Sequence, residues 1–355
     1  VKYIPVLHSP DDVVVQDTSD IIDFLEPRFP RRPVYPATPR QRLVSLLFEL
    51  YGDEWLLLPA MHYRWSFWHE RAHIDDVLEH FGLLLSPRAP RALRRFAGRR
   101  FCRPFAGALP MLGITPQTIP PLESWYREFM AQMNAHFAVH PYLLGDAPTI
   151  GDFGLMGPLY AHLGRDFHPK ALMQERAPRL YQWVERMNRP AAEGALLPGD
   201  TVPPTLLPVL RRMFAEHFPV LLDTVRRLEQ WLEQNPGQRI PRAIGEHAFR
   251  LGGVEGTRRL FPYTQWMLQR PLDYYQSLHG GDKEAVDALL HEVGGFEAMQ
   301  ALVGWADSTF PGRRMTCIID PTNGPSRGVA NKLGFKEVTA TSYHGSPVTL
   351  FERLV

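Results

Sequence analysis

The chain has 355 residues, of which 45% are hydrophobic and 22% charged, and this favours a globular protein of about two domains. The formal net charge is +1, so no overall field draws the chain to nucleic acid or to an anionic membrane. Cys102 and Cys317 are its two cysteines, and their wide separation argues against a disulfide framework or a cysteine-based zinc site. We see no membrane-spanning run and no signal peptide, and we expect a cytoplasmic protein.

Residues 1–30 read as a strand, a turn, a second strand and a helix. Tyr3 to Leu7 is a short apolar run, and the β-branched stretch Val13 to Val15 follows a turn rich in Pro and Asp. Asp17 or Thr18 then stands where a helix cap belongs, before apolar residues spaced for one buried face. Prolines recur every third residue from 27 to 39, so we interpret residues 31–40 as a linker.

Residues 41–295 form a mainly helical region, with prolines falling between the expected helices. Few segments there alternate with the period of two that marks a strand. The helices expected from hydrophobic spacing are 39–58, 68–81, 121–139, 149–163, 176–188, 203–234, 256–269 and 282–293.

The pattern changes at about residue 296. A helix is expected over 297–308, followed by a strand over 315–319, a helix over 324–333 and strands over 335–342 and 347–352. The fold class expected for the whole chain is therefore mainly α with α/β ends.

Three stretches carry a resemblance to a known family. They are IPVL at 4–7 with QDTSDIIDFLE at 16–26, and YLLGDAPTIGDFGLMGPLYAHL at 142–163, where Thr149 and Asp152 form a helix capping box. Over residues 1–295 the chain resembles a cytosolic glutathione S-transferase that lacks the start of its thioredoxin-like domain. Residues 1–30 would be the partial thioredoxin-like, glutathione-binding domain. Residues 41–295 would be the all-helical C-terminal domain, with an extension similar to that of larger bacterial members.

The same N-terminal residues suit a peptide ligand on chemical grounds. A cis-proline at Pro5 would turn the backbone of Ile4 outward, and the start of the helix at Asp17 and Thr18 offers amide donors and a hydroxyl to a carboxylate. The Asp17 carboxylate can pair with an ammonium group. The plainer alternative is an ordinary strand-entering proline and an ordinary helix cap.

The resemblance implies specific roles for these residues. Ile4 and Pro5 would hold the cysteinyl backbone of glutathione, and Asp17 and Thr18 its γ-glutamyl end. The family usually has Glu-Ser at the last two positions and a small residue where Asp20 stands. The catalytic Ser, Tyr or Cys of the family would precede Val1, so the catalytic residue is unknown. A homodimer and a small electrophilic substrate are further implications.

Three other patterns admit both a functional and a structural interpretation. His69 to His73 matches the zinc motif H-E-x-x-H, but no third ligand is evident, and we expect a polar helix face and no metal site. MHYRW at 61–65 with Trp68 suits either an apolar pocket between domains or, more simply, a packed core. The basic run over residues 88–103 suits an anion or, more simply, a solvated helix face.

The segment IIDPTNGPSRGVANKLGF at 318–335 carries a second resemblance. Residues 296–355 are similar to the second half of a GNAT N-acetyltransferase, as a fragment without the preceding wall of the cofactor cleft. By resemblance Asn323 would contact the pantetheine arm of acetyl-CoA, Ser326 would lie near the thioester, and Tyr343 is a weaker candidate. Structurally, Asn323 would instead make a turn bond and Ser326 would cap a helix.

The sequence leads to one principal functional hypothesis and two alternatives. The principal one is a glutathione S-transferase-like protein that conjugates or reduces an electrophilic small molecule. The alternatives are an acetyl-CoA-dependent N-acetyltransferase acting through the C-terminal piece and a non-catalytic helical binding module. A natural fusion, a shortened chain and a mis-assembled reading frame all account for two incomplete modules in one chain.

Overall fold

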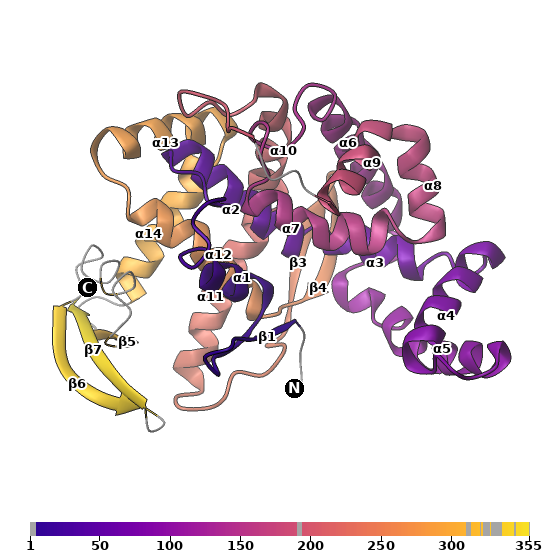
Figure 1. Cartoon of the computed structure of the whole chain (residues 1–355), viewed down its shortest axis with the longest axis horizontal. Helices are drawn as coiled ribbons and strands as arrows, with labels where there is room; N and C mark the ends of the chain where they lie inside the picture. The colour runs from indigo at the N-terminus through magenta and orange to yellow at the C-terminus, as the bar shows by residue number, and fades with distance from the viewer. Residues whose placement is uncertain are drawn as a thin grey trace. The chain divides into compact units, whose positions relative to one another are not determined.

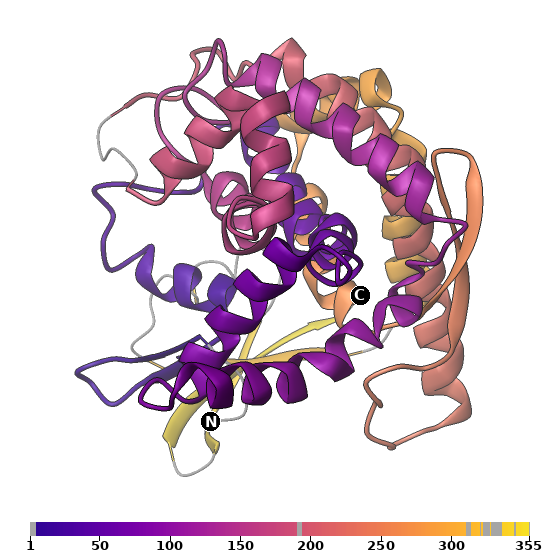
Figure 2. The same cartoon turned by 90° about the vertical axis from the view of Figure 1, so that its right-hand side faces the viewer.

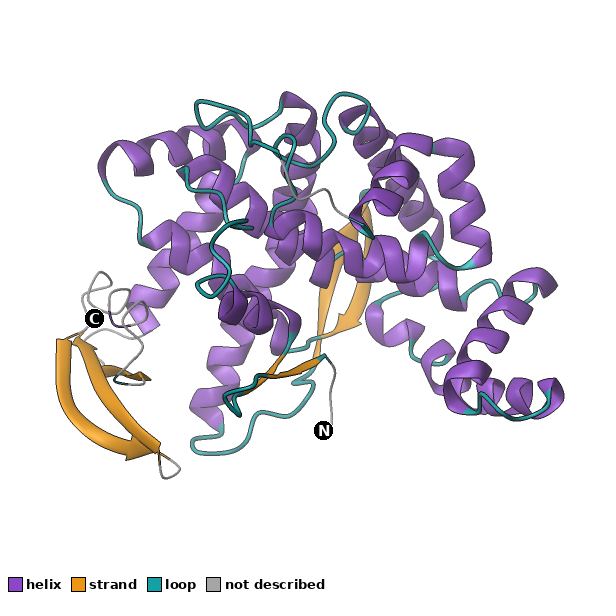
Figure 3. Ribbon diagram, in the orientation of Figure 1, coloured by secondary structure: helices purple, strands orange, loops and turns teal. Residues whose placement is uncertain are grey.

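The computed structural model describes residues 5–189, 194–309, 314–319, 321, 327, 336–343 and 346–354. The chain divides into two compact units, one made of Val1–Val34 with Leu302–Val355 and the other of Tyr35–Ala301. Helices dominate the second unit (Figure 3). Within the described ranges, no helix combines the length and the apolar character needed to cross a bilayer.

The N-terminal part of the first unit is a small hairpin followed by a helix. Strand β1 (Val6–His8) pairs antiparallel with β2 (Val14–Gln16), and α1 (Thr18–Leu25) follows at once. The turn is closed by the Ser9 hydroxyl oxygen, which accepts a hydrogen bond from the Val13 amide at 3.2 Å. The strand–turn–strand–helix order expected for residues 1–30 is confirmed. Its assignment to a thioredoxin-like domain stays a prediction.

The C-terminal part holds three antiparallel strands in the order β5–β7–β6. They are β5 (Arg314–Ile319), β6 (Lys336–Tyr343) and β7 (Ser346–Leu354), and α14 (Phe296–Thr309) precedes them. The helix and the three strands expected here are confirmed. The helix expected over 324–333 lies outside the described residues except at Arg327.

The second unit is a helical array (Figure 1). Its α-helices are α2 (Pro39–Glu54), α3 (Leu57–Trp65), α4 (Arg71–Leu85), α5 (Arg91–Ala106), α6 (Ile119–His136), α7 (Ile150–Pro158), α8 (Phe167–Arg176), α9 (Pro178–Met187), α10 (Leu207–Arg212), α11 (Phe218–Gln234), α12 (Tyr263–Gln276) and α13 (Gly280–Val293). Short 3₁₀ segments are η1 (Leu109–Leu112) and η3 (Pro204–Leu206), and π-helical segments are η2 (Leu159–Leu163) and η4 (Met213–His217).

One expectation for this unit is wrong, because residues 41–295 are not all-helical. A hairpin of β3 (Glu246–Leu251) and β4 (Val254–Arg259) occupies the start of the helix expected over 256–269. Gly252 and Gly253 both have positive φ and form its two-residue turn, which side chains with a Cβ rarely permit. Buried and exposed residues alternate along β3, and the hairpin lies along α11 (Figure 2). Helices α3 and α8 were also missing from the expected set, whereas the helix face expected over residues 88–103 corresponds to α5.

The close crossing of α2 and α7 forms the centre of this unit. A Cβ on Gly52 would lie only 2.5 Å from the carbonyl oxygen of Gly154, so glycine is required for the two helices to approach this far. Most of α2 is buried from Leu43 to Gly52. This helix therefore serves as the core element against which the others pack.

The capping box expected at Thr149 and Asp152 is present at the start of α7. The Asp152 carboxylate is fully buried and accepts hydrogen bonds from the Thr149 amide at 2.9 Å and the Thr149 hydroxyl at 3.0 Å. It also accepts from the Leu143 amide and the Trp183 indole, both at 3.1 Å. Burial raises the pKa of this carboxyl to about 6, while the four donors favour its ionised form.

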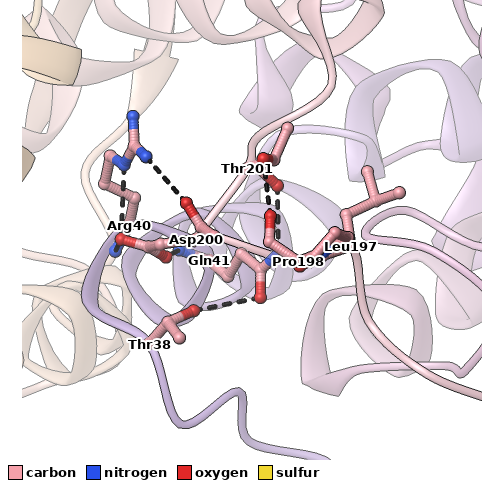
Figure 4. Close-up of polar contacts among 8 residues, drawn as sticks. Thr38, Arg40, Gln41, Leu197, Pro198, Asp200 and Thr201 are labelled. Atoms are coloured by element: carbon pink, nitrogen blue, oxygen red, sulfur yellow. Dashed lines mark hydrogen bonds and ion pairs between the residues drawn. The ribbon is translucent and has the colours of Figure 1, made fainter.

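A distant carboxylate caps the start of α2. Thr38 occupies the N-cap position without a side-chain hydrogen bond to the backbone. Asp200 instead accepts from the amides of Arg40 at 2.9 Å and Gln41 at 3.0 Å, and it also pairs with the Arg40 guanidinium (Figure 4). Its negative charge faces the positive end of the helix dipole. Asp200 has a φ of 56°, a conformation that Asp tolerates better than most residues.

Burial lowers the pKa of several histidines of the second unit because it penalises the charged ring. The pKa of His136 is lowered to about 4 and that of His162 to about 3. The Nε2 atom of His136 donates to the Tyr142 carbonyl at 3.2 Å, so its Nδ1 accepts from the Thr205 hydroxyl at 2.7 Å. A neutral ring satisfies both bonds. Burial also lowers the pKa of His62, His217 and His247.

These shifts predict that acid destabilises the helical unit. A histidine with a folded-state pKa of about 4 takes up its proton mainly in the unfolded state between pH 6.5 and 4. The free energy of unfolding should therefore fall as pH drops through this range. Replacing His136 by Asn should reduce that slope by roughly 1 kcal/mol per pH unit near pH 5.5. Urea unfolding followed by circular dichroism at several pH values measures this slope.

The exposed His69 provides a matched control for this measurement. His69→Asn replaces a ring at the surface and so controls for the substitution itself. An equal slope in the wild type and in the His136→Asn variant would contradict the assignment of a neutral, buried His136.

Candidate functional site

The structure brings Pro5, Asp17 and Thr18 together at one end of the β1–β2 hairpin. The register pairs Val6 with Gln16, and beyond this pair the Asp17 amide donates to the Pro5 carbonyl at 3.3 Å. Thr18 is the first residue of α1. The three residues expected to share a ligand site are thus neighbours, positioned by a hairpin and by a helix start.

Asp17 adopts an uncommon backbone conformation, with φ at 84° and ψ at 142°. This lies outside the small left-handed region that Asp tolerates, and such strain costs about 1–3 kcal/mol. Its Oδ1 atom accepts a hydrogen bond from the Ser19 amide at 3.0 Å, so the side chain caps its own helix. Strained residues that neighbouring structure holds in place are concentrated at ligand sites.

Thr18 supplies the donors of the site. Its side chain is exposed, and among the described residues none accepts a hydrogen bond from its amide or its hydroxyl. The amide lies in the first turn of α1, where helical N–H groups have no partner within the helix. An N–H and an O–H on one residue, at the positive end of a helix, suit a ligand carboxylate.

Negative charge also surrounds this helix start. Asp17 caps α1, and Asp20 adds a second acidic side chain in the first turn. A ligand with only a carboxylate would meet repulsion from both. A ligand that carries a carboxylate and an ammonium group side by side, as an α-amino acid does, can satisfy the Thr18 donors and the Asp17 carboxylate together.

The other expected site residues are not tested by the structure. Ile4, Asn323 and Ser326 lie outside the described residues. Tyr343 is the last residue of β6, and only its backbone is described. The acetyl-CoA roles of the last three therefore stay predictions.

The H-E-x-x-H motif does not form the helix face that zinc would need. Glu70 is the N-cap of α4, so His69 precedes the helix. His73 is buried, with its Nε2 atom donating to the Arg64 carbonyl at 3.0 Å and its Nδ1 atom accepting from the His168 amide at 3.4 Å. Glu70 binds the His168 ring at 2.8 Å. Over the described part of the chain, no three His, Cys, Asp or Glu side chains are grouped to hold a metal ion.

The aromatic and basic patterns belong to the packing of α3, α4 and α5. Trp65 and Trp68 stack in a core cluster that also contains the buried Cys102, and burial raises the pKa of that thiol to about 11. Arg94 and Arg95 of α5 pair with acidic residues of α4. These contacts are those of a core and of a solvated helix pair.

Comparison with known proteins agrees with the helical part of this description. Residues 113–190 match the family model of the glutathione S-transferase C-terminal domain. The matched segment runs from the end of η1 to the end of α9 and includes the capping box of α7. No curated protein matches the chain. The match supports a relationship between this chain and the glutathione S-transferase family.

The strain at Asp17 can be tested by substitution. Gly adopts positive φ at little cost, whereas Ala keeps the strain and loses the cap. Asp17→Gly should therefore destabilise α1 less than Asp17→Ala, by about 1–2 kcal/mol. Amide hydrogen exchange of Ile21 and Ile22 measures the local stability of the helix. Greater protection in the Ala variant than in the Gly variant would show that Asp17 is not strained.

Proposed function

We propose that this chain is a glutathione S-transferase-like protein that binds glutathione at the start of α1. The observation that carries the proposal is the joint placement of Pro5, Asp17 and Thr18, with the strained Asp17 capping the helix beside exposed Thr18 donors. The family match over residues 113–190 supports it independently.

The γ-glutamyl end and the cysteinyl residue of glutathione each have a partner in this proposal. The amide and hydroxyl of Thr18 donate to the γ-glutamyl carboxylate, and the Asp17 carboxylate pairs with the γ-glutamyl ammonium. The backbone of Ile4, held by the neighbouring Pro5, pairs with the cysteinyl residue. Bound glutathione supplies a thiolate that forms a C–S bond with an electrophilic carbon as the leaving group departs with its electron pair.

The strands β5, β6 and β7 favour a second candidate function. A three-stranded antiparallel sheet that follows α14 agrees with the α/β character of an acetyltransferase-like piece, in which acetyl-CoA would contact Asn323 and Ser326. A helical binding module without either ligand is the third candidate. Titration with both ligands distinguishes the three.

The first measurement is calorimetric titration of the purified chain with glutathione, followed by acetyl-CoA. Saturable heat with glutathione supports the transferase-like function. Heat with acetyl-CoA alone would transfer the function to the C-terminal piece. An absence of heat from both would leave the binding-module function.

Thr18 variants test the residues of the site. Thr18→Ala should weaken glutathione binding by about 1–2 kcal/mol, or roughly 5- to 30-fold, because it removes a direct hydroxyl donor. Thr18→Ser keeps the hydroxyl and should bind nearly as the wild type does. Thr257→Ala, at an exposed threonine of β4, serves as the matched control. An unchanged affinity in Thr18→Ala would exclude its hydroxyl from the site.

A further inference from the structure

A second polar cluster lies within the helical unit, at the C-terminal end of α2. It consists of Trp55 just after α2, His217 at the end of η4 and Arg258 on β4. All three side chains are buried, and Arg258 is only 6% exposed. The rings of Trp55 and His217 stack with their centroids 4.9 Å apart. The guanidinium carbon of Arg258 lies 5.9 Å from the Trp55 ring centroid.

Each of these side chains carries a buried nitrogen without a hydrogen-bond partner among the described residues. The atoms are Nε1 of Trp55, Nδ1 of His217 and Nε of Arg258. Buried polar groups in folded proteins are nearly always hydrogen-bonded to protein, water or ligand. Three unpartnered nitrogens in one cluster therefore indicate that a polar species from outside the chain completes it.

The positive charge of the cluster indicates which kind of ligand would complete its hydrogen bonds. Arg258 forms no ion pair with any described residue, although its guanidinium is almost completely buried. Burial lowers its pKa to about 10, so it keeps its positive charge at neutral pH. A buried charge is costly unless it is paired and hydrogen-bonded. The missing partner is therefore expected to be an anion.

We propose that this cluster binds a small oxyanion, a carboxylate or a phosphate, which the guanidinium of Arg258 neutralises and to which Nε of Arg258 donates a hydrogen bond. Planar guanidinium groups suit both kinds of oxyanion. The indole N–H of Trp55, whose ring centroid lies 5.9 Å from the guanidinium carbon, is a candidate second donor. The alternative occupant is a set of ordered water molecules, which would satisfy the hydrogen bonds and leave the charge unpaired.

Glu54 is the internal competitor for Arg258. Its charge acts on Arg258 from the last residue of α2, and its Oε2 atom accepts from the Thr264 hydroxyl of α12 at 2.8 Å. Burial raises the pKa of this carboxyl and lowers the pKa of the two histidines that face Arg258, His217 on η4 and His247 on β3. Near neutral pH both rings are uncharged, so the ionised form of Glu54 is what opposes an added anion.

Anion titrations of the full chain test the proposal. Formate, acetate and phosphate are each added while sodium chloride keeps the ionic strength constant, and the thermal midpoint is followed. The wild type should show a saturable rise with at least one oxyanion, and comparison of the three separates the carboxylate source from the phosphate source. Arg258→Met should remove the rise. Arg259→Met, at the exposed neighbour, should retain it.

A substitution of Glu54 should change the affinity for an oxyanion in the opposite direction. Glu54→Gln removes the competing charge and should strengthen oxyanion binding by about tenfold. Binding to the wild type should also tighten as falling pH protonates Glu54, and binding to Glu54→Gln should lack this component. Equal binding by the wild type and Glu54→Gln would contradict the competition and, with it, the placement of the anion at Arg258.

Crystals of the wild type provide a test that does not depend on the folding of a variant. A soak in sodium selenate, a tetrahedral oxyanion, should give an anomalous selenium peak in contact with the Arg258 guanidinium. Water alone at this position, together with thermal midpoints that follow ionic strength only, would overturn the proposal.

Discussion

The carboxylate of Asp152 joins three segments of the helical unit that are separate in sequence. It receives the Thr149 donors at the start of α7, the Leu143 amide from the preceding turn and the Trp183 indole of α9. Because all four donors point at one buried carboxylate, the start of α7 is fixed in direction as well as in position. The close α2–α7 crossing at Gly52 and Gly154 requires that direction.

The two candidate sites are built on opposite principles. At the start of α1 the Thr18 donors are exposed and Asp17 is partly buried, and the β1–β2 hairpin and the first turn of the helix hold them in position. In the Arg258 cluster the groups are buried, and the surrounding helices and the β3–β4 hairpin hold them. The first arrangement suits a flexible peptide ligand with charges at its end, and the second suits a compact ion that loses its water on binding.

Local sequence signals predicted the elements whose geometry depends on a few neighbouring residues. The hairpin and helix over residues 5–25, the capping box of α7 and the strands from 314 onward follow from turn, cap and period-two signals. The same holds for Pro5, Asp17 and Thr18, because the site lies within fifteen residues. Which of Asp17 and Thr18 caps α1 depends on backbone angles that the sequence leaves open.

Elements that depend on distant contacts were not predicted. The helix expected over 256–269 overlaps the end of β4, and the hairpin itself was not predicted, although Gly252 and Gly253 mark a turn. Arg258 is buried only because elements from other parts of the chain surround it. Its role as a candidate anion partner could therefore not be inferred from the residues beside it. The polar helix face expected at the H-E-x-x-H motif is wrong for a similar reason, since His69 precedes α4 and His73 is buried against other elements.

The polar partners of α2 are synthesised long after α2 itself. Asp200 caps its first turn, Arg270 pairs with Glu49, and Thr264 donates to Glu54. These partners follow α2 by roughly 160 to 220 residues, and the ribosome delivers them many seconds later at its usual pace. During synthesis α2 lacks these three partners, so the nascent chain is exposed to chaperones and proteases until its final third emerges.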